Sequence, residues 1–508
     1  MTTQDQSATE AFLSERARSG SAAHAEIVTT HISKVFVGEH AVFKLKRAVR
    51  FPYLDFSTPA ARVSACEREL TLNRRTAPTL YRAVRRVVRT DEGALAFDGE
   101  GLLVDAVVEM SRFEQADLFD SLALRGALTV PMIADLAQRI ARFHADAEVS
   151  TRHGGVAGMA AVLDINDRSL RATGLAPPGE ADELAARFRA ALSRHGPVLE
   201  SRRKTGKVRR CHGDLILRNI CLFEGVPTLF DCLEFDEDLA TIDVLYDLAF
   251  LIMDLLHRGL KGQASLLFNR YLDEVDEGGG LELIAFFVAV RAAVRAHVTG
   301  ARAAEARGAE ASAQAKEARD YLDLAASLLR EPRPRLFAVG GLSGSGKSTV
   351  SAALAPLLGL PPGARIFSSD RIRKRLHGVR PEQRLPLEAY RPEISVRVYA
   401  TMREAALEAL RAGCAVVADA VFDRPGEREM IEDVARAAGT PFDGVWLEAP
   451  IGTLTRRLEA RTHDASDATT DVLAGQLRRD LGAIAWSKID ASKDVGEIAA
   501  EALRMGEK

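Results

Sequence analysis

The segment from Gly341 to Ser348, with the sequence GLSGSGKS, is the feature that most restricts how this chain can fold. It fits the pattern G-x-x-x-x-G-K-[ST], and it lies between the apolar run Leu336–Val339 and a segment that we expect to be helical. Glycines here let the backbone wrap around phosphate groups, and the helix that follows turns its positive end toward them. The pattern therefore predicts a strand, a tight phosphate-binding loop (a P-loop) and a helix, in an α/β sheet.

The chemistry of this loop assigns roles to individual residues. We expect Lys347 to reach the β- and γ-phosphates of a nucleotide, and the hydroxyl of Ser348 to bind Mg²⁺. The nucleotide is ATP, or alternatively GTP. The predicted nucleotide contacts in this segment are Gly341, Ser343, Gly344, Ser345, Gly346, Lys347, Ser348 and Thr349.

Acidic residues follow the next two predicted strands, Ala364–Phe367 and Ala415–Ala418. Asp370 is the candidate general base for an acceptor hydroxyl, and Arg373, about one helical turn later, is the candidate acceptor contact. The alternative for Asp370 is a helix N-cap. Asp419, at a strand end beside the P-loop, is expected to contact the metal or the substrate, with capping as its alternative.

Two arginines near the C-terminus share one helix face. Arg457 and Arg461 are spaced i, i+4, and we expect them to close over the phosphates as a lid; the alternative is a solvated charged face. With these motifs, the segment from Leu336 to the end resembles P-loop kinases of the polynucleotide 5′-hydroxyl kinase, gluconate kinase and zeta-toxin type. The resemblance rests on G-x-x-x-x-G-K-S, S-x-D-x-x-R and the R-x-x-x-R pair with its D-x-S-D-A tail. It implies ATP-dependent phosphorylation of a hydroxyl, with Asp370 and Arg373 as base and acceptor clamp.

A second phosphate-handling signature lies upstream, in the sequence CHGDLILRN from Cys211 to Asn219. It gives H-x-D-x-x-x-x-N, in which Asp214 has the place of a carboxylate that accepts a hydroxyl proton and Asn219 that of a metal ligand. Asp231 follows an apolar strand and is the candidate second metal ligand. We expect His212 to be a structural hydrogen-bonding residue rather than a base.

Residues 26–330 resemble aminoglycoside phosphotransferases and the wider protein-kinase-like fold. This resemblance implies a strand lysine that holds the nucleotide phosphates, for which Lys44 is the first choice and Lys46 the alternative. It also implies a helical acid that pairs with this lysine, either Glu69 or, failing that, Glu67.

The same resemblance implies a hinge that meets the adenine base, and Glu109 and Met110 match it. One departure concerns the glycine-rich phosphate loop, because the predicted hairpin turn between residues 34–37 and 41–46 offers only Gly38. A weakly catalytic or purely regulatory first domain is therefore kept as an alternative.

The order of predicted elements separates two folds. Early strands followed by helices over residues 26–330 predict an α+β protein-kinase-like domain, and alternating strands and helices over 336–508 predict an α/β P-loop domain with a parallel sheet. Residues 331–335, EPRPR, predict a proline-rich linker, and residues 1–25 a loosely held helical tail. The whole chain resembles a bacterial family that fuses an aminoglycoside-phosphotransferase-like domain to an AAA-type P-loop kinase domain.

Composition and charge limit the binding partners and the cellular compartment that we expect for this protein. The 508 residues carry a net charge of −3, which gives no bulk attraction to nucleic acid or to a membrane. Five cysteines without a C-x-x-C pair predict neither a disulfide framework nor a zinc site. The polar N-terminal segment lacks the apolar core of a signal peptide, and the apolar runs are too short to span a membrane, so we expect a cytoplasmic protein.

These observations predict an ATP- and Mg²⁺-dependent phosphotransferase with two potential kinase sites. Its acceptor is expected to be a hydroxyl of a small molecule, such as a sugar, an aminocyclitol or a nucleoside. Two alternatives stay open. One is a polynucleotide 5′-hydroxyl kinase that uses a basic groove at Arg371, Arg373, Lys374 and Arg375, and the other is an ATP-binding switch without turnover.

Overall fold

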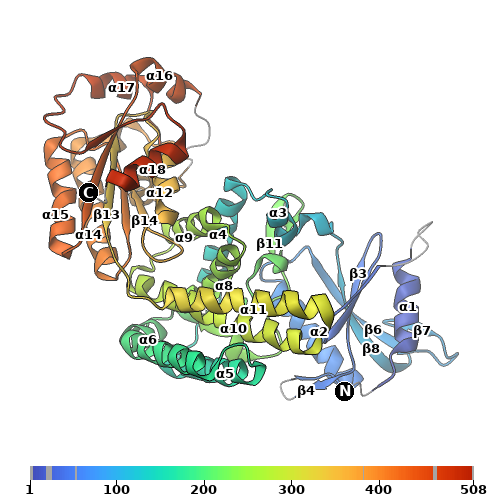
Figure 1. The fold of residues 1–508 in the computed structure, drawn as a ribbon. Coiled ribbons are helices and arrows are strands. Elements are labelled where there is room, and N and C mark those ends of the chain that lie inside the picture. Colours follow the sequence, from blue (N-terminus) through green and yellow to red (C-terminus); the bar gives the residue numbers. More distant parts are fainter. Residues whose placement is uncertain (1–3, 19–25, 52–53, 382, 461–465, 506–508) are drawn as a thin grey trace. The chain divides into compact units, whose positions relative to one another are not determined.

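The computed structural model describes residues 4–18, 26–51, 54–381, 383–460 and 466–505 (Figure 1). The chain divides into two compact units. Unit 1 comprises residues 1–159 and 199–251, and unit 2 comprises residues 160–198 and 252–508. Each unit carries one of the two signatures, so each is described by itself.

Unit 1 is built around a six-stranded antiparallel sheet with the strand order β1-β2-β3-β8-β6-β7. Strands β2 and β3 form the predicted hairpin, and β3 also pairs with β8, with Lys44 opposite Val108. The strands are β1 (Glu26–Thr29), β2 (Ser33–Val37), β3 (Val42–Lys46), β6 (Tyr81–Arg89), β7 (Leu95–Phe97) and β8 (Leu102–Met110).

Helix α2 (Pro59–Asn73) packs against this sheet and carries the predicted partner of the strand lysine. The helix begins after Thr58, whose hydroxyl accepts a hydrogen bond from the backbone N–H of Ala61, and Pro59 occupies its first turn. Its buried face includes Cys66 and Glu69. A carboxylate is thus turned toward the sheet and needs a buried cation to balance its charge.

Helix α1 (Ser7–Ala17) packs on the sheet through Leu13 and Ala17, which join a core cluster with Phe36 and Leu45. Just before the helix, the side chain of Gln6 donates to the backbone oxygen of Lys46 at 2.9 Å. We expected a loosely held tail here. The described part of this segment is instead anchored, through the buried side chains of Leu13 and Ala17, one turn apart, and through the hydrogen bond of Gln6.

The remainder of unit 1 consists of short ribbons and helices that present the H-x-D loop. Strand β9 pairs with β12, and β10 pairs with β11, each pair antiparallel. These elements are β4 (Arg50–Phe51), β5 (Leu54–Asp55), α3 (Phe119–Leu124), α4 (Val130–Asp146), β9 (Val208–Arg210), β10 (Ile220–Phe223), β11 (Val226–Leu229), α7 (Glu237–Ala240), β12 (Thr241–Asp243) and the first half of α8 (Val244–His257).

Unit 2 contains the predicted parallel sheet, with the order β14-β15-β13-β16-β17. All four strand pairs are parallel, which confirms the α/β prediction for this segment. The strands are β13 (Leu336–Gly341), β14 (Arg365–Ser368), β15 (Val416–Asp419), β16 (Phe442–Glu448) and β17 (Ser487–Asp490). The central strand β13 is buried along its whole length, as an interior parallel strand must be.

Helices cover both faces of this sheet. In Figure 1, α14 (Pro392–Arg411) and α15 (Pro425–Ala438) lie on one side of it, and α12 (Lys347–Leu354) and α18 (Val495–Met505) lie on the other. The core beneath α12 and α18 includes Phe337, Val339, Leu354, Val417 and Ile498. Three more helices complete this part: α13 (Ser369–Leu376), α16 (Ile451–Glu459) and α17 (Thr470–Leu477).

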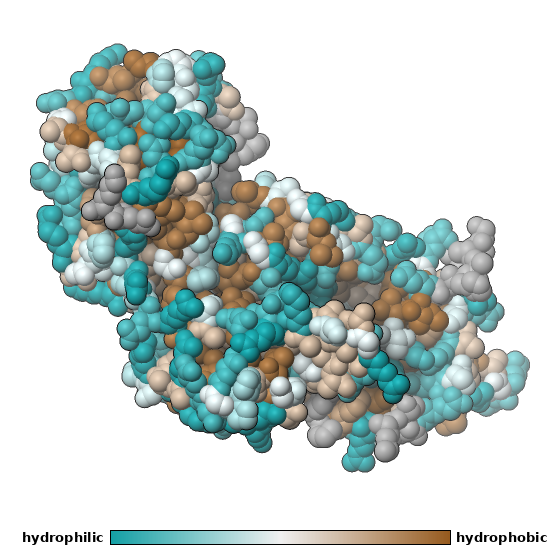
Figure 2. All heavy atoms as spheres, in the orientation of Figure 1, coloured by the Kyte–Doolittle hydropathy of each residue, from teal (hydrophilic) through white to brown (hydrophobic). Residues whose placement is uncertain are grey.

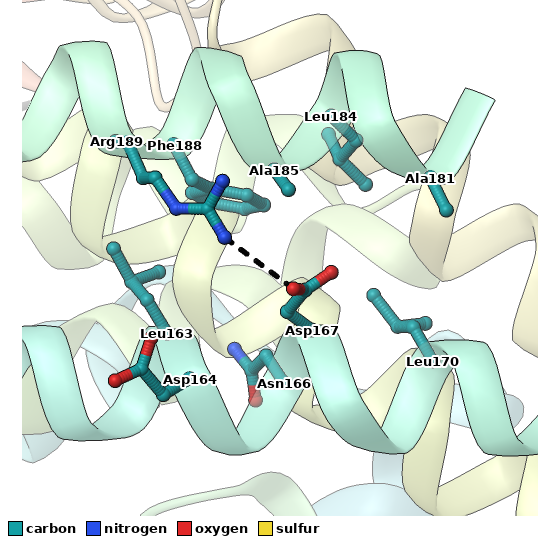
Figure 3. Close-up of a pocket in the computed structure, with 10 residues that line it drawn as sticks. All are labelled: Leu163, Asp164, Asn166, Asp167, Leu170, Ala181, Leu184, Ala185, Phe188 and Arg189. Atoms are coloured by element: carbon teal, nitrogen blue, oxygen red, sulfur yellow. Dashed lines mark hydrogen bonds and ion pairs between the residues drawn. The ribbon is translucent and has the colours of Figure 1, made fainter. Parts of the chain in front are cut away.

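Unit 2 also contains helices from the middle of the chain. They are α5 (Gly155–Thr173), α6 (Pro178–Lys204), α9 (Lys261–Glu274), α10 (Ile284–Glu305) and α11 (Gly308–Leu328). Helices α5, α6 and α8 have residues in both units. Figure 3 shows a small pocket between α5 and α6, where Leu163 and Leu170 face Leu184 and Phe188. Asp167 and Arg189 form an ion pair of 3.4 Å across it.

Among the described residues, no helix is long and apolar enough to cross a membrane. On the face visible in Figure 2, hydrophilic and hydrophobic residues are interspersed.

Candidate active sites

The P-loop of unit 2 takes a tight conformation that requires its glycines. Gly341, Gly344 and Gly346 have φ angles of 144°, 84° and 88°, which side chains rarely adopt. A Cβ atom at Gly344 would lie only 2.6 Å from the backbone oxygen of Leu454. The loop therefore follows β13, lies close to α16 and leads directly into the N-terminus of α12, where backbone N–H groups can receive phosphate oxygens.

Two oxygen ligands meet at the start of α12. The hydroxyl of Ser348 donates to Oδ2 of Asp419 at 2.7 Å, because β13 and β15 are parallel neighbours whose carboxyl ends coincide. Burial raises the pKa of Asp419 above its ordinary value, although Lys347 and the bond from Ser348 act to lower it. A hydroxyl and a buried carboxylate are hard oxygen donors, so this pair fits Mg²⁺. Lys347 is folded back on the loop, with Nζ donating to the oxygen of Leu342 at 3.1 Å.

Asp370 lies in the first turn of α13, directly after β14. The register pairs Ser368 with Asp419, which places Asp370 two residues beyond the metal-site carboxylate of the adjacent strand. The N-cap of α13 is Ser368 rather than Asp370, so the capping alternative for Asp370 does not hold. Within the described part of the chain its carboxylate has no hydrogen-bond or ion-pair partner, and it is therefore available to accept a proton.

The basic cluster after Asp370 is largely turned into the protein. Arg373 donates to the oxygen of Ala389 at 2.7 Å and lies over the ring of Tyr390, with its guanidinium carbon 4.8 Å from the ring centre. Lys374 forms a buried ion pair of 2.8 Å with Asp467. Asp467 also accepts the hydroxyl of Tyr390 at 2.7 Å. These contacts shape the segment beside Asp370.

Arg371 forms an ion pair of 3.3 Å with Asp273, which leaves Arg375 as the exposed member of the cluster. The basic groove expected for a nucleic-acid substrate is therefore not formed by these four side chains. The side chains of Arg371, Arg373 and Lys374 are paired or buried by neighbouring groups in unit 2, which the linear sequence could not reveal.

Of the two predicted lid arginines, the structure describes Arg457. Arg457, on α16, donates to the oxygen of Ala491 at 2.8 Å, and one of its nitrogens lies 3.8 Å from where a Cβ atom of Gly346 would stand. Arg461 falls outside the described residues, so its lid role stays a prediction.

Gln476 is a contact of the P-loop that the sequence did not indicate. Its side-chain oxygen accepts the backbone N–H of Ser343 at 2.9 Å, and the side chain is buried. It lies on α17, whose Leu473 packs with Leu454 and Leu458 of α16. A lone glutamine in an ordinary helical segment carries no motif, and the contact spans 133 residues of sequence.

In unit 1, the predicted lysine and its predicted acid are in contact. Nζ of Lys44 donates to Oε1 of Glu69 at 2.7 Å, and it also forms an ion pair with Asp231. Burial alone would lower the pKa of Lys44, but Asp231 and Glu69 raise it well above its ordinary value. Burial alone would raise the pKa of Asp231, but Lys44 lowers it. The structure thus brings together β3, α2 and Asp231, two residues beyond the end of β11, as a phosphate-binding lysine and a metal ligand require.

The alternative residues, Lys46 and Glu67, make other contacts than Lys44 and Glu69 do. Lys46 is fully buried, and its ammonium lies 2.5 Å from Glu69 and 2.5 Å from Glu234. Glu67 is exposed and lies 3.7 Å from Arg86. Lys46 and Glu234 therefore extend the ion-pair network into the core rather than toward a nucleotide, a role that the sequence analysis missed.

Asp214 and Asn219 form the polar end of the H-x-D loop. The side-chain amide of Asn219 donates to Oδ2 of Asp214 at 2.8 Å and to its backbone oxygen at 2.9 Å. Arg218 lies 3.4 Å from the same carboxylate. Because the amide nitrogen of Asn219 is used in this way, its amide oxygen is the atom left for a metal ion.

Asp247, at the start of α8, binds the backbone of the H-x-D loop. Its carboxylate accepts the backbone N–H groups of His212 at 3.1 Å and Gly213 at 2.9 Å, and it also contacts Nε2 of His144 at 3.1 Å. Burial lowers the pKa of His212, and its Nε2 lies 3.0 Å from the oxygen of Phe230. A buried ring whose pKa is lowered in this way fits the structural role that we expected for His212.

The predicted hinge residues end strand β8. Met110 is buried and pairs with Val42 and Tyr81 of the neighbouring strands. The carboxylate of Glu109 accepts from Nε of Arg85 at 2.6 Å. Any contact of this segment with a base is therefore expected from the backbone.

The chain resembles proteins of two kinds. Residues 54–287 match the model of the phosphotransferase enzyme family, and residues 336–480 match that of an AAA domain. An uncharacterised protein of Mycobacterium tuberculosis (strain H37Rv) is 28% identical over 477 residues, which make up 92% of each chain.

Solved structures of kinases resemble each part. A gluconokinase from Sinorhizobium meliloti 1021 is 24% identical and covers 34% of this chain and 94% of its own, with a TM-score of 0.25. A choline/ethanolamine kinase family protein from Mesorhizobium loti is 14% identical and covers 60% of this chain and 92% of its own, with a TM-score of 0.36. The two family models thus divide the chain into a segment that matches the phosphotransferase enzyme family, residues 54–287, and a segment that matches an AAA domain, residues 336–480.

Proposed function

We propose that this protein is an ATP- and Mg²⁺-dependent kinase that phosphorylates a hydroxyl of a small molecule, with the P-loop site of unit 2 as its principal catalytic centre. One observation carries the proposal. Ser348 opens α12 and contacts Asp419 at the end of β15, and Asp370 follows the neighbouring parallel strand β14, in the first turn of α13. Within the described residues, the carboxylate of Asp370 has no hydrogen-bond or ion-pair partner. A phosphoryl transfer needs these two features next to each other.

In this proposal, Ser348 and Asp419 would hold Mg²⁺, which would supply positive charge to the phosphates. Asp370 accepts the proton of the acceptor hydroxyl as that oxygen forms a bond to the γ-phosphorus. The bond between the γ-phosphorus and ADP breaks, and Lys347 and the N–H groups of the loop stabilise the charge that develops. Asp370 then returns its proton to the solvent.

The acceptor class proposed is a sugar, an aminocyclitol or a nucleoside rather than a polynucleotide. Support comes from the internal pairing of Arg371, Arg373 and Lys374, and from a net charge of −3 for the whole chain. Phosphate contacts with a nucleic acid need exposed lysines and arginines.

Unit 1 is proposed as a second ATP site. Lys44 would hold the nucleotide phosphates, Asn219 and Asp231 the metal, and Asp214 would accept the proton of a hydroxyl. The ion pairs of Lys44 with Glu69 and Asp231 support the nucleotide part of this assignment. Whether unit 1 transfers a phosphoryl group or only binds ATP is decided by the same experiment as the principal proposal.

The experiment measures ATP consumption by the full-length protein against pooled hydroxyl compounds. The variants are Lys347→Ala, Asp370→Asn and Asp214→Ala, each checked for folding by circular dichroism. We expect an acceptor-stimulated activity that is lost in Lys347→Ala and falls about 10²- to 10⁴-fold in kcat in Asp370→Asn.

Retention of that activity in Lys347→Ala, with its loss only in Asp214→Ala, would transfer the principal site to unit 1. ATP binding without stimulated turnover by any acceptor would instead favour a nucleotide-dependent switch.

A further inference from the structure

Strand β14 is at the edge of the parallel sheet, and it pairs with β15 on one side only. The backbone groups on its other side meet the side chain of Asn269, on helix α9. The amide nitrogen of Asn269 donates to the oxygen of Ala364 at 3.1 Å, and its amide oxygen accepts the N–H of Ile366 at 2.7 Å. A residue of a parallel neighbouring strand makes the same two bonds, to the residues on either side of its partner. Asn269 therefore satisfies an edge that would otherwise be open.

The residue between these two, Arg365, is bound to the end of the same helix. Its guanidinium donates to the backbone oxygen of Asn269 at 3.1 Å and to that of Leu272 at 3.3 Å. It also lies 2.8 Å from the carboxylate of Asp273. A buried cation at the C-terminal carbonyls of a helix is favoured by the helix dipole, so these contacts fix both partners.

Asp273 joins three guanidinium groups. It pairs with Arg365 at 2.8 Å, with Arg371 at 3.3 Å and with Arg270 at 3.0 Å. Burial alone would raise the pKa of Asp273, but Arg365, Arg371 and Arg270 lower it, so the group is charged at neutral pH. Arg365 opens β14, and Arg371 is the residue after Asp370. One carboxylate thus holds the chain on both sides of the candidate base.

We propose that Asn269 and Asp273 are positioning residues for the P-loop site, because they hold β14 and the first turn of α13 so that Asp370 faces the phosphate loop. The proposal rests on the role of Asp370 in the proposed function. Helix α9 lies within residues 54–287, which match the phosphotransferase enzyme family. The P-loop site therefore depends on a helix that belongs to the other family match, and the AAA match at residues 336–480 is incomplete as a catalytic unit without it.

A positioning role and a purely structural role predict different kinetics. Loss of the Asn269 contacts frees the edge of β14, whereas Lys347 and Ser348 are carried by β13 and α12. A shift of Asp370 by a fraction of an ångström lowers the rate of proton transfer and leaves ATP binding in place. General loosening of the unit would instead weaken ATP binding, catalysis and thermal stability together.

The experiment uses the full-length protein with Asn269→Ala, Asp273→Asn and the control Gln263→Ala, which removes an amide from the same helix. In the acceptor-dependent assay, we expect kcat to fall about 10- to 100-fold in Asn269→Ala and Asp273→Asn. KM for ATP should stay within about twofold, and Gln263→Ala should match the wild type. Asn269→Asp keeps the acceptor for Ile366 and Arg365 and should have an intermediate kcat; it also replaces Asn269→Ala if that variant does not fold.

A kcat of Asn269→Ala equal to that of the wild type would overturn the proposal. A parallel loss of kcat, ATP affinity and thermal stability would also overturn it. Absence of turnover in the wild type would refute the proposed function but would not test the positioning contact. In that case, amide hydrogen exchange tests whether Asn269 holds β14. Faster exchange confined to residues 364–372 in Asn269→Ala supports the contact, and unchanged or uniformly faster exchange contradicts it.

Discussion

At the scale of single residues, environment separates groups of the same chemical type. Asp419 is buried and accepts a hydrogen bond from the hydroxyl of Ser348, whereas Asp370, just after the neighbouring strand β14, has no partner within the described part of the chain. Lys44 and Lys46 also differ in their surroundings, although they are only two positions apart on β3. Lys44 reaches Asp231, while Lys46 is closed into the core with Glu69 and Glu234.

The buried lysine gives a prediction for stability. Replacement of Lys46 by methionine removes the counter-charge of Glu234 and one of the two counter-charges of Glu69, both of which are buried. Loss of one partner from a buried ion pair costs about 3–5 kcal/mol. We expect Lys46→Met to lower the free energy of unfolding of the unit that contains it by about this amount, measured by urea denaturation.

The matched control is Lys34→Met on the neighbouring strand β2. Lys34 is partly exposed and pairs with Glu10 at 2.5 Å, so its loss should cost no more than about 1 kcal/mol. Equal effects of the two substitutions would show that burial does not distinguish these lysines.

At the scale of elements, local patterns predicted most of what is close in sequence. The strand, loop and helix around Lys347 follow from one short motif. The pairing of Lys44 with Glu69 was implied only by the resemblance to aminoglycoside phosphotransferases. Strand β17, with the sequence SKID, was not predicted, because only Ile489 among its residues is apolar and a buried strand needs more.

Contacts between distant elements were not predictable from the sequence. Gln476 and Asn269 meet the P-loop and β14 across 133 and 97 residues, and neither residue stands in a recognisable motif. The sequence left an exposed groove at Arg371 to Arg375 open as an alternative. The acids that pair with Arg371 and Lys374, which are Asp273 and Asp467, lie far away in sequence and could not be assigned from it.

The contact between α17 and the P-loop gives a prediction for nucleotide binding. Gln476→Ala leaves the N–H of Ser343 buried without its acceptor and frees α17 from the loop. A hydrogen bond of this kind contributes about 0.5–1.5 kcal/mol net, which corresponds to an increase of about 2- to 10-fold in Kd for ATP. Calorimetric titration with an ATP analogue measures it.

The control for this prediction is Asp471→Asn, an exposed change in the first turn of the same helix. It should bind the analogue as the wild type does. Unchanged affinity in Gln476→Ala would mean that α17 does not support the loop when nucleotide is bound.

At the scale of the whole molecule, each unit has its own lysine and its own acids. Lys44, Glu69 and Asp231 come from unit 1, and Lys347, Ser348 and Asp419 come from unit 2. No residue is shared between these two sets. We therefore propose that one chain contains two separate nucleotide sites.

The measurement that tests this claim most directly is the stoichiometry with which a non-hydrolysable ATP analogue binds in the presence of Mg²⁺. The full-length wild type is compared with Lys44→Met and Lys347→Ala. We predict two analogue molecules per wild-type chain and one per chain in each variant. A single molecule per wild-type chain, or loss of both in either variant, would contradict the account.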